Sequence, residues 1–282
     1  MADLASGTGG SRVRVMNLAI IGCGKMGSAL VGGIVESGVI KARNIHAFDA
    51  YLAAVEQLVE AQGVVAADSA DAAVEAAEVV LVCVKPADVA SLGGLLKAAA
   101  GSKLVVSIAA GVTLKTMAEC FGDRHRLVRV MPNTPALLGA GVAGIAPASG
   151  VTPEDLGLVE RVFASVGKVM EVPERLMDAV TGLSGSGPAY VYTVIEAMAD
   201  GGVLMGLPRD KALEAAAQTV LGAARMVLES GMHPGQLRDE VTSPGGTTAA
   251  GLEALEKGGL RVSLLAAVRA AAERSAELGK AK

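Results

Sequence analysis

The chain has 282 residues, more than one average domain, so its length predicts two domains. Half of the chain is apolar (51%), which suffices for buried cores. Aromatic residues make up 2% and Trp is missing, so the elements must pack through small side chains that let them approach closely. A formal net charge of −4 argues against the broad basic surface that nucleic acid requires.

Three cysteines, Cys23, Cys83 and Cys120, lack the spacing of a metal site. We interpret them as small buried side chains in a reducing compartment. Residues 1–16 are small and polar and predict a disordered tail, not a secretory signal. The best candidate for a membrane span, residues 189–205, contains two acidic residues. We therefore expect a cytoplasmic protein with no membrane segment.

The first part of the chain alternates short apolar runs with helical patterns. The expected strands are residues 17–21, 45–48, 78–84 and 103–109, followed by shorter ones near 126–131, 141–146 and 168–171. The expected helices cover residues 25–37, ending at Gly38, and 51–61, ending at Gly63. Continuous apolar strands that alternate with helices predict an α/β domain over residues 17–175, with a parallel sheet covered on both faces.

After Pro173 the composition shifts to Ala, Leu, Glu and Arg. Helical patterns cover residues 188–205, 209–229, 247–257 and 260–278, which predicts an all-α domain over residues 176–282. Such long apolar helices would bury more surface by pairing with a second copy of the chain. We therefore expect a homodimer formed through the C-terminal helices.

The segment IIGCGKMGSAL, residues 20–30, carries Gly22, Gly24 and Gly27 in the GxGxxG spacing. It follows an expected strand and opens an expected helix, which is the context of a Rossmann dinucleotide-binding turn. Gly22 permits the tight turn, Gly24 lets a pyrophosphate approach the backbone, and Gly27 lets the helix pack on the strand. A glycine-rich turn without a ligand is the alternative.

Asp49 ends the second expected strand, 22 residues beyond Gly27. An acidic residue at this place accepts hydrogen bonds from the adenine ribose and repels a 2′-phosphate, which favours NADH over NADPH. Lys41 and Arg43 lie upstream and would be available to compensate. The alternative is a turn or N-cap role before the helix at residue 51.

Residues 241–251, VTSPGGTTAAG, precede a helical pattern. A segment rich in Ser, Gly and Thr at a helix start offers N–H donors and hydroxyls to an anion, in particular a substrate carboxylate. The alternative is a flexible connection in which Ser243 or Thr247 caps the helix. The residues alone leave both interpretations open.

Several segments, in order, resemble the pyrroline-5-carboxylate reductase family. They are Val84–Pro86 (VKP), Ser107–Val112, residues 131–135 (MPNTP), 181–192 (TGLSGSGPAYVY) and 235–261 (GQLRDEVTSPGGTTAAGLEALEKGGLR). The resemblance implies an N-terminal Rossmann domain and a C-terminal helical dimerisation domain, with further assembly into decamers in some members. It also implies reduction of L-1-pyrroline-5-carboxylate to L-proline with NADPH or NADH, the last step of proline biosynthesis.

The resemblance further implies the site residues. Those expected to bind the cofactor are Gly22, Cys23, Gly24, Lys25, Met26, Gly27, Cys83, Val84, Lys85, Pro86, Ala109 and Ala110, beside Asp49. Those expected to hold the substrate carboxylate are Val241, Ser243, Gly246, Thr247 and Thr248. Some members carry Ala where this chain has Thr247, so the resemblance implies a role for the Thr247 backbone N–H and not for its hydroxyl. Thr248 is the expected catalytic residue, hydrogen-bonding the ring nitrogen directly or through water.

Asn133 is expected to orient the nicotinamide side of the pocket, with an Asx-turn before Pro135 as the alternative. The histidines His46, His125 and His233 lack metal-type spacing, so we expect structural or exposed roles for them and no metal site.

Two rival functions fit part of the chain. A hydroxyacid dehydrogenase normally uses a lysine from the first long helix after the Rossmann domain, and residues 188–205 contain no Lys or Arg. A dinucleotide-sensing or scaffolding protein would bind cofactor without turnover and has no need for the loop at 241–248.

Overall fold

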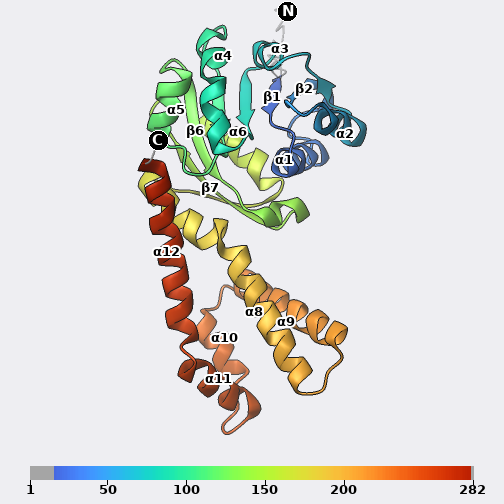
Figure 1. Ribbon diagram of the computed structural model, residues 1–282, viewed down its shortest axis with the longest axis vertical. Coiled ribbons are helices and arrows are strands. Elements are labelled where there is room, and N and C mark those ends of the chain that lie inside the picture. The colour runs from blue at the N-terminus through green and yellow to red at the C-terminus, as the bar shows by residue number, and fades with distance from the viewer. Residues whose placement is uncertain (1–15, 281–282) are drawn as a thin grey trace, which may run out of the picture. The chain divides into compact units, whose positions relative to one another are not determined.

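The computed structural model describes residues 16–280 of the chain (Figure 1). The predicted disordered tail, residues 1–16, lies outside this range apart from Met16. The described chain forms two compact units. The first ends at Glu174, and the second begins at Arg175 and also takes in Asn133–Pro135.

The first unit contains an eight-stranded sheet of order β3-β2-β1-β4-β5-β6-β7-β8 among the residues described. The strands are β1 Leu18–Ile21, β2 Ile45–Phe48, β3 Val65–Ala66, β4 Val79–Val82, β5 Leu104–Ser107, β6 Arg126–Met131, β7 Gly141–Pro147 and β8 Gly167–Glu171. The predicted parallel sheet is confirmed with one exception, since β7 pairs antiparallel with β6. Residues 132–140 join these two strands and are too few for the crossover that parallel pairing needs.

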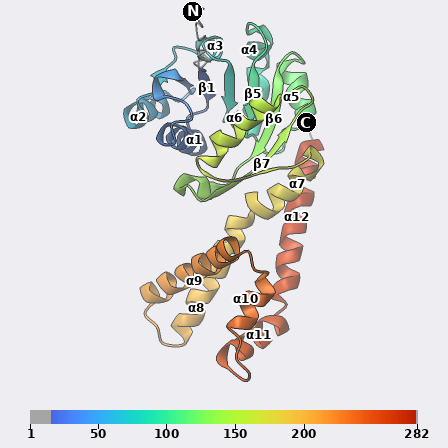
Figure 2. The same ribbon diagram turned by 180° about the vertical axis from the view of Figure 1, so that it is seen from behind.

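Helices cover both faces of this sheet because alternate strand residues point to opposite sides. Leu18 and Ile20 of β1 enter a core with α1 (Lys25–Glu36), α2 (Leu52–Gln62) and α6 (Pro153–Ala164). Ala19 and Ile21 enter a second core with α3 (Ala70–Glu75), α4 (Gly93–Ala98) and α5 (Leu114–Phe121). Figure 2 shows α6 lying across the sheet, seen from behind. The predicted helices α1 and α2 are followed by Gly38 and Gly63, both left-handed.

His125 has the structural role expected of the histidines. Its Nδ1 accepts a hydrogen bond from the Lys103 backbone N–H at 3.1 Å, and its Nε2 lies 2.8 Å from the Leu96 carbonyl oxygen. Burial lowers the pKa of His125, so the ring stays neutral and keeps both bonds. No cluster of three or more potential metal ligands occurs in residues 16–280.

The second unit is helical, as predicted. It consists of α7 Met177–Val180, a π-helix Thr181–Gly185, α8 Gly187–Leu204, α9 Arg209–Ser230, α10 Pro234–Glu240, α11 Thr247–Lys257 and α12 Leu260–Lys280. Its α8 and α9 form a hairpin that packs through buried alanines (Figure 1). Helix α12 packs on α7 and the π-helix, where the Ser275 hydroxyl lies 2.7 Å from Asp178 Oδ1. A Cβ on Gly182 would lie 2.6 Å from the Val268 carbonyl oxygen, so glycine is required for this approach.

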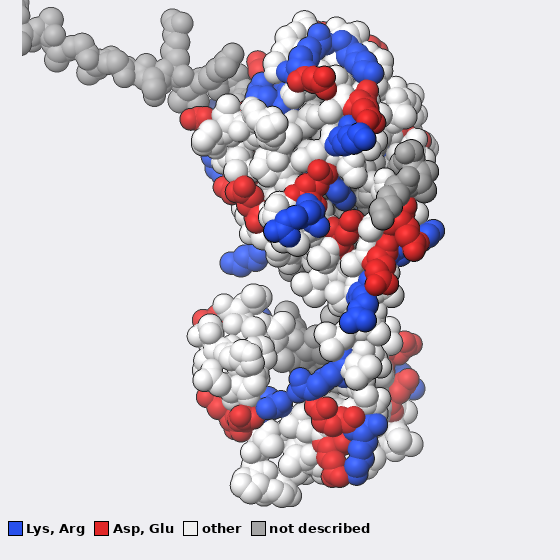
Figure 3. Space-filling view, turned by 90° about the vertical axis from the view of Figure 1, so that its left-hand side faces the viewer, with Lys and Arg blue, Asp and Glu red and all other residues white. Residues whose placement is uncertain are grey.

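Large apolar side chains remain on the surface of the helical unit. Leu204 is 84% exposed, Met205 83% and Leu228 71%. On the face shown in Figure 3, acidic and basic side chains are interspersed and uncharged surface lies between them. No helix in the described part of the chain is long and apolar enough to cross a bilayer.

Candidate functional site

The residues predicted to hold a dinucleotide follow β1, β2, β4 and β5. These strands are parallel neighbours in the sheet, so their carboxyl ends meet at one edge. The turns at that edge contain the glycine segment from Gly22 to Gly27, then Asp49, Cys83–Pro86 and Ala109-Ala110. A crevice outside the carboxyl ends of strands is where open α/β sheets bind ligands.

The three motif glycines have different surroundings. Gly22 has φ +105°, and a Cβ there would lie 2.7 Å from the Cys83 carbonyl carbon and oxygen. A Cβ on Gly27 would overlap the Gly22 carbonyl oxygen, so the start of α1 packs directly on the turn. Gly24 has open space where its Cβ would be. The close packing expected of Gly22 and Gly27 is therefore present, and Gly24 leaves room for a ligand.

The start of α1 has the form of an anion cradle. Gly24 is its N-cap residue and makes no side-chain capping bond, and Lys25 behind it is exposed. The first amides of a helix have no partner within the helix, and their dipoles favour negative charge. The chain thus fits a pyrophosphate at this turn, and no side chain fills its place.

Asp49 ties two turns together. Its Oδ2 accepts a 2.7 Å hydrogen bond from the Cys23 backbone N–H, and its Oδ1 accepts a 2.8 Å bond from the Tyr51 N–H. Asp49 therefore has the turn role that the sequence offered as an alternative. It is not the N-cap of α2, which is Tyr51. A carboxylate offers about four lone-pair sites, so these two bonds leave acceptor capacity for ribose hydroxyls.

Cys23 and Cys83 line the same edge as neutral thiols. Burial and the nearby Asp49 charge raise the pKa of Cys23 to about 12. Burial, followed by the proximity of Cys23, raises the pKa of Cys83 as well. Both side chains therefore stay protonated and add no negative charge beside a phosphate. Cys23 is buried, Cys83 and Cys120 are half-buried, and all three are free.

The turns after β4 and β5 present mainly backbone to this edge. Lys85 is exposed and precedes the 3₁₀ helix Pro86–Leu92, for which its side chain makes no capping bond. Ala109 is buried and donates its N–H to the Ser107 hydroxyl at 3.3 Å, while Ala110 is exposed. Small side chains here leave the backbone accessible.

The second predicted cluster lies in the helical unit, between α10 and α11. Gly246 is the N-cap of α11 and has no side-chain capping bond, so the alternative in which Ser243 or Thr247 caps this helix is wrong. The Gly246 N–H instead donates to the Ser243 carbonyl at 3.0 Å, and a Cβ on Gly246 would overlap the Ser243 hydroxyl. The preceding Gly245 has φ +65°. This tight turn needs both glycines and leaves the first α11 amides without a side-chain cap.

The predicted carboxylate-binding residues share this turn. Thr247 is exposed and Thr248 is half-buried, and both lie in the first turn of α11. Ser243 is exposed, and Val241 is exposed at the end of α10. Hydroxyls and uncapped amides are thus brought together as the sequence suggested.

Asn133 is buried in the helical unit. Its Nδ2 donates a 3.0 Å hydrogen bond to the Ser184 carbonyl of the π-helix. Its expected cofactor contact stays a prediction. Sequence reasoning missed the π-helix, an element that is frequent at functional sites. The one available signal was the glycine-rich run TGLSGSGPAY, which interrupts the helical pattern.

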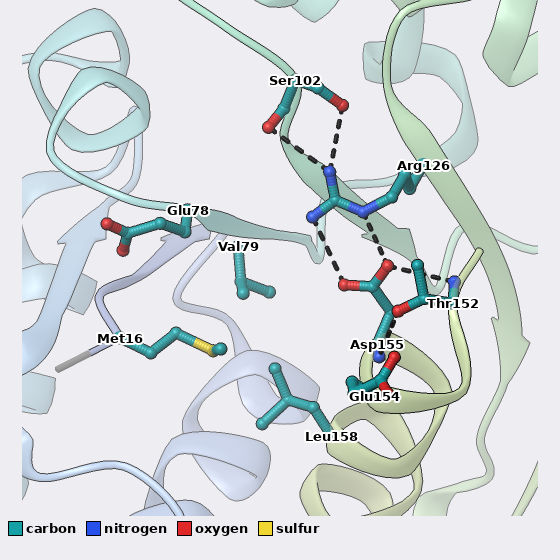
Figure 4. A pocket seen from close by; sticks show the side chains of 9 residues that line it. All are labelled: Met16, Glu78, Val79, Ser102, Arg126, Thr152, Glu154, Asp155 and Leu158. Carbon is teal, nitrogen blue, oxygen red and sulfur yellow. Dashed lines mark hydrogen bonds and ion pairs between the residues drawn. The ribbon is translucent and has the colours of Figure 1, made fainter. Parts of the chain in front are cut away.

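A hollow of about 460 Å³ lies at the opposite, amino-terminal ends of β4, β5 and β6 (Figure 4). The Arg126 guanidinium crosses it and pairs with Asp155, with Nε to Oδ2 at 2.6 Å, and also reaches the Ser102 hydroxyl at 3.0 Å. The pKa of Asp155 is lowered, because its hydrogen bonds and ion pair outweigh the desolvation that opposes them. Arg126, Asp155 and Ser102 are thus bonded to one another, and the hollow lies away from the glycine turn.

Comparison with known proteins gives two family models and many relatives. The model for pyrroline-5-carboxylate reductase dimerisation matches residues 174–278, and that for coenzyme F420-dependent NADP oxidoreductase matches residues 17–111. Pyrroline-5-carboxylate reductase from Methanosarcina acetivorans is 48% identical over 264 residues, covering 93% of this chain and 98% of that protein. The Escherichia coli enzyme of the same name is 42% identical, with the same coverage of both chains.

Solved structures agree with these matches. A pyrroline-5-carboxylate reductase from Coxiella burnetii superimposes with a TM-score of 0.87 at 35% identity, covering 94% of this chain and 98% of that one. A Plasmodium falciparum pyrroline carboxylate reductase, solved with NADP bound, gives a TM-score of 0.81 at 33% identity, with the same coverage.

The glycine environments predict a contrast between two alanine variants. Gly24→Ala should fold normally, because its Cβ meets nothing, but should weaken dinucleotide binding about tenfold by obstructing the phosphate approach. Gly27→Ala should lower the free energy of unfolding by about 1–3 kcal/mol, because its Cβ overlaps backbone. Thermal melts with and without dinucleotide measure both effects. Unchanged affinity in Gly24→Ala would contradict the phosphate site.

Proposed function

The chain belongs to the pyrroline-5-carboxylate reductase family, and from that premise we propose that it reduces L-1-pyrroline-5-carboxylate to L-proline with NADPH or NADH, the last step of proline biosynthesis. The observation that carries this proposal is 48% identity over 93% of the chain to a reductase of that name. Neither rival function has such support, because structures of other oxidoreductases fall to 14–20% identity and share the fold alone.

In the proposed site, the first unit holds the cofactor, and the reduced nicotinamide supplies the hydride. The turn from Gly22 to Gly27 binds the pyrophosphate through the amides of α1, and Asp49 receives the adenine ribose. The residues Cys83–Pro86, Ala109 and Ala110 line the rest of the crevice through backbone, and Asn133 orients the nicotinamide side. The open space at Gly24 and the missing side-chain cap of α1 support this assignment.

The second unit binds the substrate through the turn before α11. We assign the carboxylate to the amides and hydroxyls of Ser243, Gly246, Thr247 and Thr248, beside Val241. Thr248 hydrogen-bonds the ring nitrogen and relays a proton to it. Threonine is a weak acid, so its contribution is closer to hydrogen bonding than to full proton transfer. The uncapped start of α11 and its position in the family-matched segment support the assignment.

The family model describes residues 174–278 as a dimerisation region, which indicates that the chain forms homo-oligomers. We propose a homodimer through the C-terminal helices, with assembly into decamers as a further possibility for this chain. The exposed Leu204, Met205 and Leu228 support the dimer, because apolar surface on this scale marks an interaction site.

We also propose that the two units are separate domains, residues 17–175 and 176–282. The chain divides into two compact units after Glu174, which supports this proposal. A cytoplasmic location stays a prediction that rests on the three free cysteines.

The activity is tested by following absorbance at 340 nm with pyrroline-5-carboxylate and each reduced cofactor in turn. We expect turnover with both and a preference for NADH, because the Asp49 carboxylate repels a 2′-phosphate. Asp49→Ser should shift the preference toward NADPH. Turnover with 3-hydroxyacids, and none with pyrroline-5-carboxylate, would favour the dehydrogenase. A strong NADPH preference in the unaltered chain would remove the proposed role of Asp49.

Thr248→Ala should lower kcat/KM for pyrroline-5-carboxylate about tenfold or more, a loss of about 1.4 kcal/mol in transition-state stabilisation. Thr248→Ser keeps the hydroxyl and should retain most of the activity. Steady-state kinetics under saturating cofactor measure both variants. Kinetics of Thr248→Ala equal to those of the unaltered enzyme would exclude Thr248 from the mechanism.

Sedimentation at micromolar concentration should give at least twice the mass of one chain. Leu228→Glu, at an exposed leucine of α9, should lower that mass by placing a charge in the apolar surface. Leu52→Glu makes the same change at an exposed leucine of the first unit and serves as the control. A monomeric mass for the unaltered chain would rule out the dimer.

A further inference from the structure

Tyr51 is an exposed aromatic residue in a chain that has few. The chain contains three Phe, three Tyr and no Trp. In the first unit two Phe are buried in the cores and the third is half-buried. Tyr51 is 70% exposed in the turn between β2 and α2. Its ring contributes little to the fold, so its place in the turn invites another explanation.

The backbone of Tyr51 is fixed to the glycine turn through one side chain. Asp49 Oδ1 accepts the Tyr51 N–H at 2.8 Å, and Asp49 Oδ2 accepts the Cys23 N–H at 2.7 Å. The Asp49 carboxylate therefore fixes the start of α1 relative to the start of α2. A ring mounted on such a fixed turn binds a ligand with little ordering cost.

The adenine half of a bound dinucleotide would lie nearest this turn. An acidic residue that ends the second strand of this fold meets the adenine ribose, and the base is bonded directly to that ribose. The base therefore lies beside Asp49, at the surface where Tyr51 is exposed. The turns after β4 and β5, Cys83–Pro86 and Ile108–Ala110, contain no aromatic residue. Tyr51 is the one flat side chain in these turns.

We propose that Tyr51 stacks on the adenine ring and is a binding residue for the adenine half of the cofactor. This inference rests on the proposed use of NADPH or NADH. Stacking uses the π-face of the base and takes no account of the ribose 2′ position. Tyr51 therefore strengthens binding of NADH and NADPH alike, while Asp49 sets the ratio between them.

Binding to the intact protein is measured with four probes: NADPH, NADH, AMP and reduced nicotinamide mononucleotide. Tyr51→Ala should raise the Kd of NADPH, NADH and AMP about fivefold or more, the low end of base–aromatic stacking. The mononucleotide lacks adenine, so its Kd should not change. Tyr51→Phe keeps the ring and should match the unaltered protein. Gln57→Ala, at an exposed position of α2, is the control and should also match it.

Because the chain has no Trp, its three tyrosines account for the protein emission. AMP should quench part of this emission in the unaltered protein. Tyr51→Phe leaves Tyr190 and Tyr192 as the background, and the quenching should disappear. Melting temperatures show whether each variant is folded, and Tyr51→Leu provides a second variant without a π-face.

The outcomes separate this inference from the proposed function. If the unaltered protein reduces pyrroline-5-carboxylate but Tyr51→Ala and Tyr51→Leu bind AMP as tightly as it does, the stacking contact is wrong and the function stands. Equal quenching in Tyr51→Phe leads to the same conclusion. If the unaltered protein binds neither NADPH nor NADH, the proposed function fails, and this inference fails with it.

Discussion

The site at the edge of the sheet depends on the hydrogen bonds of one carboxylate. Asp49 accepts from the Cys23 N–H and the Tyr51 N–H, so it fixes the glycine turn against the turn that follows β2. Bonds from backbone amides to an ionised carboxylate are stronger than those between neutral groups. In the proposed cofactor site the same charge would also disfavour a 2′-phosphate, so that one residue would set both the shape of the turn and the choice of cofactor.

A carboxylate beside the proposed pyrophosphate site needs compensation, to which backbone groups contribute as well as the exposed Lys25 side chain. The start of α1 contributes uncapped amides. Cys23 and Cys83 remain neutral because burial raises the pKa of each thiol. Neutral thiols add no repulsion beside the turn.

Much of this arrangement was predictable from the sequence. The GxGxxG turn, the strands before and after it, and the four long helices follow from periodicity and glycine placement, because these signals are local. The short helices α3, α4, α5, α7 and α10 were not predicted, nor was the two-residue β3, because a few residues carry too little periodicity. Helix α6 was missed as well, although the Thr152 capping box and Pro153 mark its start in the sequence. The alternative in which Ser243 or Thr247 caps α11 is wrong: both have capping side chains, but the Gly245–Gly246 turn puts Gly246 at the N-cap position. The antiparallel pairing of β7 depends on its chain connection, and the approach of α12 to the π-helix depends on contact between segments far apart in the sequence, so neither follows from a local pattern.

The helical unit shows how a chain with few aromatic residues packs its helices. Its hairpin is held by Ala199, Ala212 and Ala216, and Gly182 lets α12 approach the π-helix. Small residues bring backbones together but remove little apolar area from water, and stabilisation scales with that area. Several leucines and methionines of this unit, among them Leu204, Met205 and Leu228, lie on the outside, so their hydrophobic stabilisation is available only to a partner. The turn from Ser243 to Thr248 belongs to the same unit, so in the proposed dimer one set of helices carries both the pairing surface and the turn that binds the substrate carboxylate.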